Sequence, residues 1–311
     1  MSQSRSADRR HGRVSFTPYV RTTTVKLFSI AGVIAALLAA SAAGQDAVEI
    51  KIGYPKAGDR AKVTIEEKNE TKLSLKIQGK EQGKDEVKTK SLVYVDEVIE
   101  NPAGGKQPTK VKRSYEKAVT GNAGVDTTLG IEGKTVLIEK KGEKYAFSVD
   151  GKAVDAESRK LLDAEFNKAD KDDSREMMFP KKAVKPGDTW TIDAEKLSKS
   201  LNDKDFKVDA AKLVANGKLV KAYTKDGNQF GMIEVNVTVP ITDLGPKSPI
   251  KLKEGKLTVA ISGDAVIDGT SPQGKSVSVM TFAVAGSGER LEMKMEAKVT
   301  ETRTLVPLQR K

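Results

Sequence analysis

The amino-acid sequence predicts a mainly β protein, α+β by content, in which long antiparallel strands form one or more curved sheets. Apolar and charged residues alternate without a break from Leu291 to Val299, a period of two that is typical of a strand with one buried face. The same alternation recurs in seven other segments: 48–54, 63–65, 73–77, 136–138, 145–149, 233–239 and 257–261. The chain has no cysteine, so its stability must come from burial and sheet hydrogen bonds. We therefore expect a broad sheet, in the form of an open or partial barrel.

The first element along the chain is a leader rather than a strand. A basic stretch up to Lys26 precedes an apolar run, Leu27–Ala43, which is rich in alanine. This run is too short for a comfortable membrane span, which needs roughly 20 apolar residues. The small residues at its end predict a secretory signal peptide that is cleaved after Ala42, Ala43 or Gly44. An uncleaved membrane anchor is the alternative.

The leader divides the chain into two parts and predicts where the larger part resides. Residues 1–43 are the N-terminal extension and cleaved signal peptide, and residues 44–311 are an exported β-rich domain without a membrane span. This domain should be periplasmic or extracellular. The basic stretch is unusually long, so translation can start near Val25 instead of Met1, because a GTG start codon is written as valine when it is read internally.

Removing the leader changes the charge and the chemistry of the chain. The stretch up to Lys26 holds six basic residues and one acidic residue, so the net charge falls from +11 to +6. It also holds His11, the only histidine. Without histidine and cysteine, Ser-His-Asp and Cys-His nucleophilic sites and the usual zinc and copper sites are excluded. We assign no catalytic residue, no metal ligand and no cofactor.

The remaining charges are mostly lysines mixed with aspartate and glutamate. Nucleic-acid binding favours a clustered basic face with aromatic stacking partners, and the only short basic cluster is Lys110–Arg113. We therefore expect no nucleic-acid partner.

The first half of the predicted domain covers residues 46–153. Its strands are separated by turn signals at 70–71, 79–83, 101–105 and 141–142. Hairpins should therefore dominate the connections. The strand predicted from Glu86 to Glu100 reaches about 50 Å at ~3.4 Å per residue, and strands of this length usually curve.

A helical insert follows at about 155–178. Asp155 is a good N-cap, and Leu162 and Phe166 lie four residues apart on one apolar stripe. The acidic run Asp170–Ser174 offers oxygens at alternating positions, but the glycine and glutamate of a calcium-binding EF-hand loop are missing. We interpret the run as a charged helix end.

The second half covers residues 180–306. It begins with turn chemistry and a short helix at about 194–201, capped by Asp193. Two further long strands are predicted, Lys207–Tyr223 and Glu289–Thr304. Either helix can cover one face of an open sheet.

The most distinctive motif opens this second half. Pro186 and Gly187 suit a tight turn, Asp188 can accept a bond from nearby backbone, and Trp190 then starts a strand. As the only tryptophan, Trp190 is predicted to be a core anchor, with stacking on a ligand as the alternative. A similar Pro-Lys-Ala-Gly-Asp sequence, Pro55–Asp59, precedes a strand in the first half. We therefore expect two similar halves.

The segment containing this motif resembles uncharacterised exported bacterial families that are rich in β structure. In those families a proline, a spacer and then Pro-Gly-Asp-x-Trp introduce the second half of a β-rich domain. The resemblance covers about Gly130 to the C-terminus. It implies a fold and no activity.

Together these features predict an exported cell-envelope protein with a binding or structural role and no enzymatic activity. A curved sheet with flexible Met293 and Met295 on its apolar face can form a groove for a lipid, an acyl chain or a lipoprotein. Two alternatives stay open. One is a hydrolase that uses carboxylates or a serine–lysine pair, and the other is a purely structural envelope protein. The sequence does not predict the oligomeric state.

Overall fold

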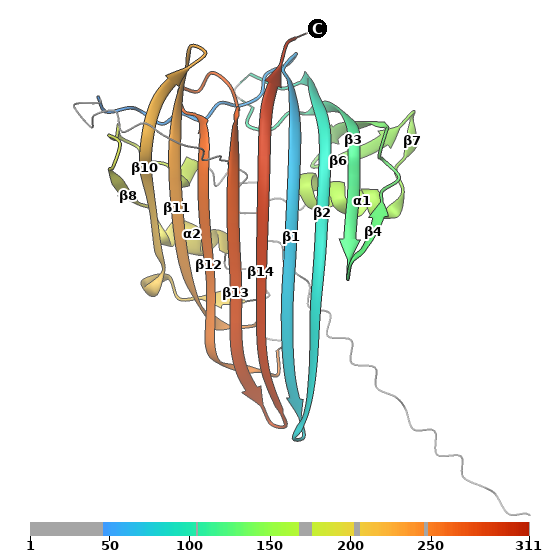
Figure 1. The fold of residues 1–311 in the computed structure, drawn as a ribbon, viewed down its shortest axis with the longest axis vertical. Coiled ribbons are helices and arrows are strands. Elements are labelled where there is room, and N and C mark those ends of the chain that lie inside the picture. Colours follow the sequence, from blue (N-terminus) through green and yellow to red (C-terminus); the bar gives the residue numbers. More distant parts are fainter. Residues whose placement is uncertain (1–45, 104, 168–175, 202–205, 246–247, 311) are drawn as a thin grey trace, which may run out of the picture.

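The computed structural model describes residues 46–310, apart from 104, 168–175, 202–205 and 246–247. It confirms a mainly β protein with a long antiparallel sheet that is not closed (Figure 1). The predicted leader and the acidic run Asp170–Ser174 lie outside the described residues.

The first half of the chain forms one flank of the sheet. Its strands are β1 (Arg60–Ile77), β2 (Lys80–Glu100), β3 (Lys110–Asn122), β4 (Val125–Thr128), β5 (Thr135–Lys141), β6 (Lys144–Val149) and β7 (Lys152–Ala153). The helix α1 (Ala156–Leu162) follows and continues as a π-helical turn, η1 (Asp163–Asn167). The predicted continuation to Met178 falls partly outside the described residues and ends in a 3-10 turn, η2 (Glu176–Met178).

The second half of the chain forms the other flank. Its elements are β8 (Thr189–Thr191), α2 (Ala194–Leu201), β9 (Lys207–Val208), η3 (Ala210–Lys212), β10 (Val214–Lys225), β11 (Asn228–Asp243), β12 (Lys251–Val266), β13 (Gly274–Gly288) and β14 (Leu291–Leu308). The predicted helix at about 194–201 is therefore present, and the backbone N–H of Lys196 donates to the carboxylate of Asp193 at 3.0 Å.

The strands follow the order β7-β6-β5-β3-β2-β1-β14-β13-β12-β11-β10-β8, with β4 beside β3 and β9 beside β11. The two halves join where β1 pairs with β14, from Arg60 opposite Leu308 to Ile77 opposite Leu291. All other neighbours in this order follow one another closely along the chain. The two edge strands of the sheet, β7 and β8, are connected along the chain by the helical insert. The strands therefore follow one another as in an up-and-down barrel whose β7 and β8 are not paired.

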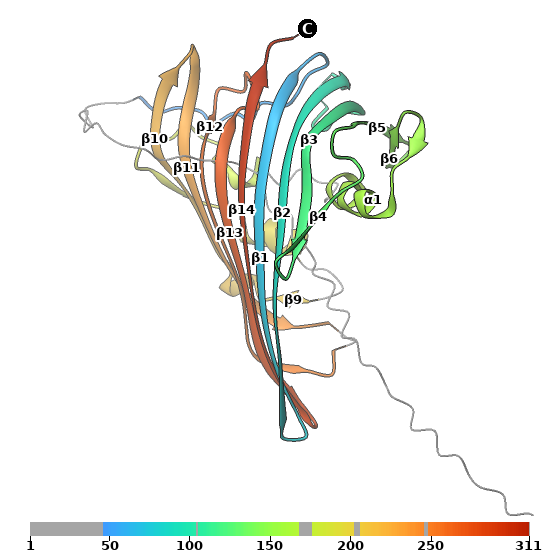
Figure 2. The ribbon, with the colours of Figure 1, turned by 45° about the vertical axis from the view of Figure 1, so that its right-hand side comes forward.

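Both helices lie on the same side of the sheet, which we call the inner face (Figure 1). Leu162 of α1 joins a core formed over β1, β2, β3, β5 and β6. Leu197 and Leu201 of α2 join a second core over β10, β11 and β12. The sheet curves around these two cores (Figure 2). The opposite, outer face carries mainly charged and hydroxyl side chains along β1 and β14.

Two predicted features of the strands differ from the structure. The turn predicted at Glu70–Thr71 is wrong, because β1 runs through it as one strand of 18 residues. Glu70 pairs with Lys298 across the strands, and such opposite charges favour continuous pairing. The strand predicted over Lys207–Tyr223 is also wrong as a single element. The carboxylate of Asp209 accepts a bond from the N–H of Ala211 at 3.1 Å, which starts the 3-10 turn η3 between β9 and β10.

The predicted strand at 48–54 is not formed either. Val48 makes one antiparallel bridge to Val184, and Lys51 makes one parallel bridge to Asp268. The segment meets two different partners because it crosses the upper end of the sheet in Figure 1 instead of running along one strand. Its alternation reflects burial of Ile50 in the core near β10–β12.

Candidate functional site

The turn before β8 is built by the Pro-Gly-Asp motif. Its backbone N–H at Asp188 donates to the carbonyl of Lys185 at 3.0 Å, with Pro186 second and Gly187 third at φ +94°. This arrangement is typical of a type II turn, which favours glycine at the third position. The Asp188 carboxylate accepts from the N–H of Lys185 at 2.8 Å. The backbones of Gly187 and Asp188 then bond to that of Leu219 on β10. These bonds place the edge strand β8 beside β10.

Trp190 follows this turn and is half-buried against the second core. Its indole N–H donates to the carbonyl of Met178 at 2.8 Å, which ties η2 to the sheet. The ring lies directly over Gly217 of β10. The indole is thus held by packing on one side and by a backbone hydrogen bond at its edge.

The same turn introduces β1. The Asp59 carboxylate accepts from the N–H of Lys56 at 2.7 Å, and the N–H of Asp59 donates to the carbonyl of Lys56 at 2.9 Å. Gly58 has a φ of +85°. Gly58 and Asp59 bond to Val98 of β2 as Gly187 and Asp188 bond to Leu219. The first strand of each half therefore begins with one shared local structure.

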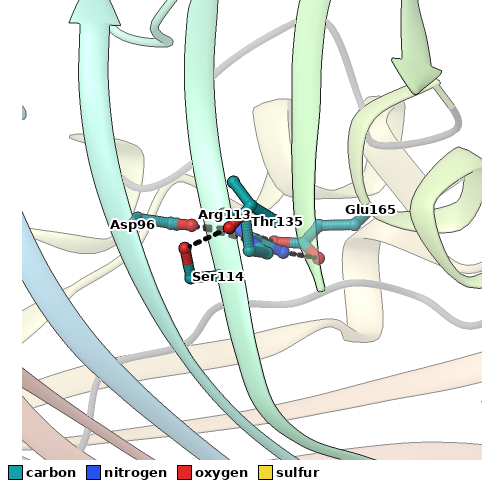
Figure 3. Close-up of polar contacts among 5 residues, drawn as sticks. All are labelled: Asp96, Arg113, Ser114, Thr135 and Glu165. Atoms are coloured by element: carbon teal, nitrogen blue, oxygen red, sulfur yellow. Dashed lines mark hydrogen bonds and ion pairs between the residues drawn. The ribbon is translucent and has the colours of Figure 1, made fainter. Parts of the chain in front are cut away.

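A buried arginine connects α1 and η1 to the sheet (Figure 3). The guanidinium of Arg113 on β3 donates two bonds to Asp96 on β2, at 2.7 and 2.8 Å. It donates two more to Glu165 on η1, at 2.8 and 3.1 Å. Its plane covers the ring of Tyr94, 3.8 Å from the centroid. Burial alone would lower the pKa of Arg113, but the charges of Asp96 and Glu165 raise it above its ordinary value.

This cluster has a structural role, because it attaches η1 to the sheet. Its charged groups bond to one another instead of facing a ligand. Both carboxylates accept hydrogen bonds from the Arg113 guanidinium, so neither Asp96 nor Glu165 is an isolated acid or base. The sequence groups Arg113 with the short basic cluster Lys110–Arg113, but in the structure its side chain is only 3% exposed and does not contribute to a basic surface. The missed signal is the position of Arg113 in the alternation. It lies two residues from Val111 and two from Tyr115, on the same side of the strand, and both neighbours are buried.

The second feature is an apolar surface on the inner face near the β1–β2 and β13–β14 turns. Its cross-strand pairs are Leu73 with Met295, Leu75 with Met293, and Ile77 with Leu291. We call these six residues the apolar shelf. All are partly exposed, and Ile77 reaches 39%. Met293 and Met295 also pack against the second core, so the shelf extends the buried core into solvent.

The helices do not reach this part of the sheet. In Figures 1 and 2 the lower ends of β1, β2, β13 and β14 project beyond both α1 and α2. The alternation of residue types along β14 thus continues past the helices, with apolar residues on the inner face and Glu292, Lys294 and Glu296 on the outer face. Among the described helices, none covers the shelf.

An open depression of about 700 Å³ lies between the two hairpin turns beside the shelf. Its charged lining consists of three cationic and two anionic side chains, Lys76, Lys253, Arg290, Glu289 and Glu292. Because the two signs nearly balance, the depression by itself favours neither a cation nor an anion.

Neither a scan against protein-family models nor a search of curated proteins gives a match to this chain. Within the described residues, every helix is too short or too polar to cross a membrane. The surfaces of the sheet are therefore the features that can indicate a function.

Proposed function

We propose that this is an exported binding protein of the cell envelope that holds an apolar chain, such as the acyl chain of a lipid or lipoprotein, on the apolar shelf. The shelf is the observation that carries the proposal. It exposes three aliphatic pairs on one face of β1 and β14, while the other face of the same strands is charged. Export is supported by the predicted signal peptide.

The energetics favour this kind of ligand. Burying apolar surface contributes about 25 cal/mol per Å², or ~0.8 kcal/mol per methylene group. Covering the exposed parts of these leucine, isoleucine and methionine side chains with an acyl chain would therefore stabilise the complex without any directional bond. Met293 and Met295 suit such a ligand because methionine adapts its shape to irregular apolar contacts.

The test uses residues 44–311 and a fluorescent fatty acid whose emission rises in apolar surroundings. We expect saturable binding by the wild-type protein. Leu75→Lys should weaken it at least about tenfold, because it places a charge in the contact. Ser74→Lys is the matched control, since Ser74 is the neighbouring exposed residue on the outer face. Absence of binding, or equal effects of the two lysines in folded variants, would contradict the proposal.

A further inference from the structure

We infer that the ligand of the apolar shelf is an anionic amphiphile, whose negative group faces a row of lysines on β2. This row, which we call the lysine rim, consists of Lys80, Lys84, Lys88 and Lys90. The inference rests on the proposed function and specifies the chemistry of its ligand.

The strand register places the rim beside the shelf. Lys80 lies opposite Ile77, and Lys84 lies opposite Leu73. Directly paired residues of antiparallel strands project to the same face of a sheet. Lys80 and Lys84 therefore lie on the inner face directly beside the shelf, on either side of Gln82. Lys88 and Lys90 continue the row on the same face, opposite Asn69 and Glu67.

The outer face of the same two strands shows a different pattern. There Glu81 lies opposite Lys76, and Asp85 lies opposite Lys72. Each acid on this face of β2 thus has a basic partner on β1. On the inner face, the cross-strand neighbours of Lys80 and Lys84 are apolar, so their charges have no such counterpart across the strand.

The ion pairs of the rim leave an excess of positive charge. Glu86 lies 3.8 Å from Lys84 and 3.2 Å from Lys88, so one carboxylate serves two lysines. Lys90 pairs with Glu67 of β1. Among the described residues, Lys80 makes no ion pair. An amphiphile lying on the shelf would meet this excess charge at its edge.

The lysines can reach such a ligand without being buried. Lys84 is 69% exposed and Lys88 is 50% exposed, so their ammonium groups stay hydrated. The aliphatic stem of a lysine can lie along apolar surface while its charge remains in water. The rim therefore suits a headgroup held at the edge of the shelf and exposed to solvent.

The experiment compares three amphiphiles with the same twelve-carbon chain, each below its micelle concentration. They are dodecyl phosphate, dodecylphosphocholine and dodecyltrimethylammonium, titrated by calorimetry at low salt. We expect dodecyl phosphate to bind about three- to tenfold more tightly than the zwitterionic compound, and the cationic compound to bind most weakly. The difference should shrink at 0.5 M salt because the charges are exposed.

Two variants assign the effect to the rim. Lys80→Gln/Lys84→Gln should bring dodecyl phosphate close to the affinity of dodecylphosphocholine and leave the latter unchanged. Lys72→Gln/Lys76→Gln removes the same charge from the outer face and is the matched control. Circular dichroism checks the fold of both, and Lys80→Gln alone replaces the double variant if that variant is unfolded.

The outcomes separate the inference from the proposed function. If all three amphiphiles bind equally, or if both double variants lose the same preference, the lysine rim does not select the ligand and the apolar shelf still binds chains. If none of the three binds, the proposed function fails and the inference fails with it. A preference lost only in the rim variant supports both.

Discussion

Gly217 shows how one residue fixes the position of the only tryptophan. A Cβ atom built at Gly217 would lie 2.1 Å from the Trp190 ring, which is far inside van der Waals contact. We expect Gly217→Ala to displace the ring and to lower the free energy of unfolding by about 1–3 kcal/mol. Urea denaturation followed by tryptophan fluorescence measures this loss.

Gly83→Ala is the control for this prediction. The nearest atom to a Cβ at Gly83 is the carbonyl oxygen of Leu73 at 3.6 Å, an ordinary contact. This substitution should be neutral or slightly stabilising, since alanine has less backbone freedom in the unfolded chain. Equal losses at Gly83 and Gly217 would contradict the role of the Trp190 ring.

Ala123 illustrates a residue that the local backbone does not favour. It has a φ of +51° and precedes Gly124 in the β3–β4 turn. Both central residues of such a hairpin turn have positive φ, a conformation that asparagine tolerates better than alanine. Ala123→Asn should therefore stabilise the protein by about 0.5 kcal/mol and raise its melting temperature. Gln82→Asn, within β2, should give no such gain.

At the scale of elements, Arg113 determines how firmly η1 is held to the sheet. Arg113→Met removes the hydrogen bonds that Asp96 and Glu165 accept from the guanidinium. Both carboxylates are partly exposed, at 22% and 25%, so water compensates some of the loss. We expect a destabilisation of about 2–4 kcal/mol by chemical denaturation. Adding Glu165→Gln should recover part of it, and an unchanged stability in the single variant would refute this attachment.

The helix α1 should show a pH dependence that arises at its N-cap. Hydrogen bonds from the Ser158 hydroxyl and from the backbone N–H groups of Ser158 and Glu157 lower the pKa of Asp155. A carboxyl group with a lowered folded-state pKa stabilises the protein above its unfolded pKa, and this contribution is lost as the pH falls through the folded value.

Asp155→Ala should therefore cost about 1 kcal/mol at pH 7, and the difference from wild type should shrink below about pH 4. Stability measured at pH 7 and pH 3 tests this expectation. Asp155→Asn keeps an acceptor without the titrating group, so its stability relative to wild type should improve as the pH falls. A constant difference for Asp155→Ala would contradict a role for the ionised cap.

The elements also show what the sequence can predict. Alternation identifies a strand and its buried face, as it does from Leu291 to Val299, because the polarity of each residue matches the burial of its own position. It does not identify the partner strand, so nothing local indicates that Leu73 lies beside Met295. Arg113 was grouped with the basic residues Lys110 and Lys112 by its charge, although its position in the alternation matches that of its buried neighbours.

The candidate binding surface could likewise be predicted from the sequence only in part. Met293 and Met295 could be placed on an apolar face from the sequence, and the structure adds that both are only partly buried, at the border of the second core. The lysine rim could not be predicted, since its position next to the shelf depends on the pairing of β1 with β2.

At the scale of the whole molecule, the two halves should unfold together. β1 and β14 are paired along their entire length, so neither half can lose its central strand without exposing the other. We expect one transition in urea, with coincident curves from Trp190 fluorescence and from circular dichroism of the sheet. Ala297→Pro, in the middle of β14, should lower the urea midpoint by the same amount in the fluorescence curve and in the circular dichroism curve. Two separate midpoints in the wild type would show that the halves are independent.

The position of β14 in the sheet also determines when the sheet can form during synthesis. Among the described strands it is synthesised last, yet it lies between β13 and β1 in the middle of the sheet. Until it arrives, the 18 residues of β1 present an unpaired edge, which is a hazard for aggregation. A polypeptide that stops before Leu291 would lack its centre instead of an outer strand. Premature termination near the C-terminus should therefore be as damaging as a large deletion.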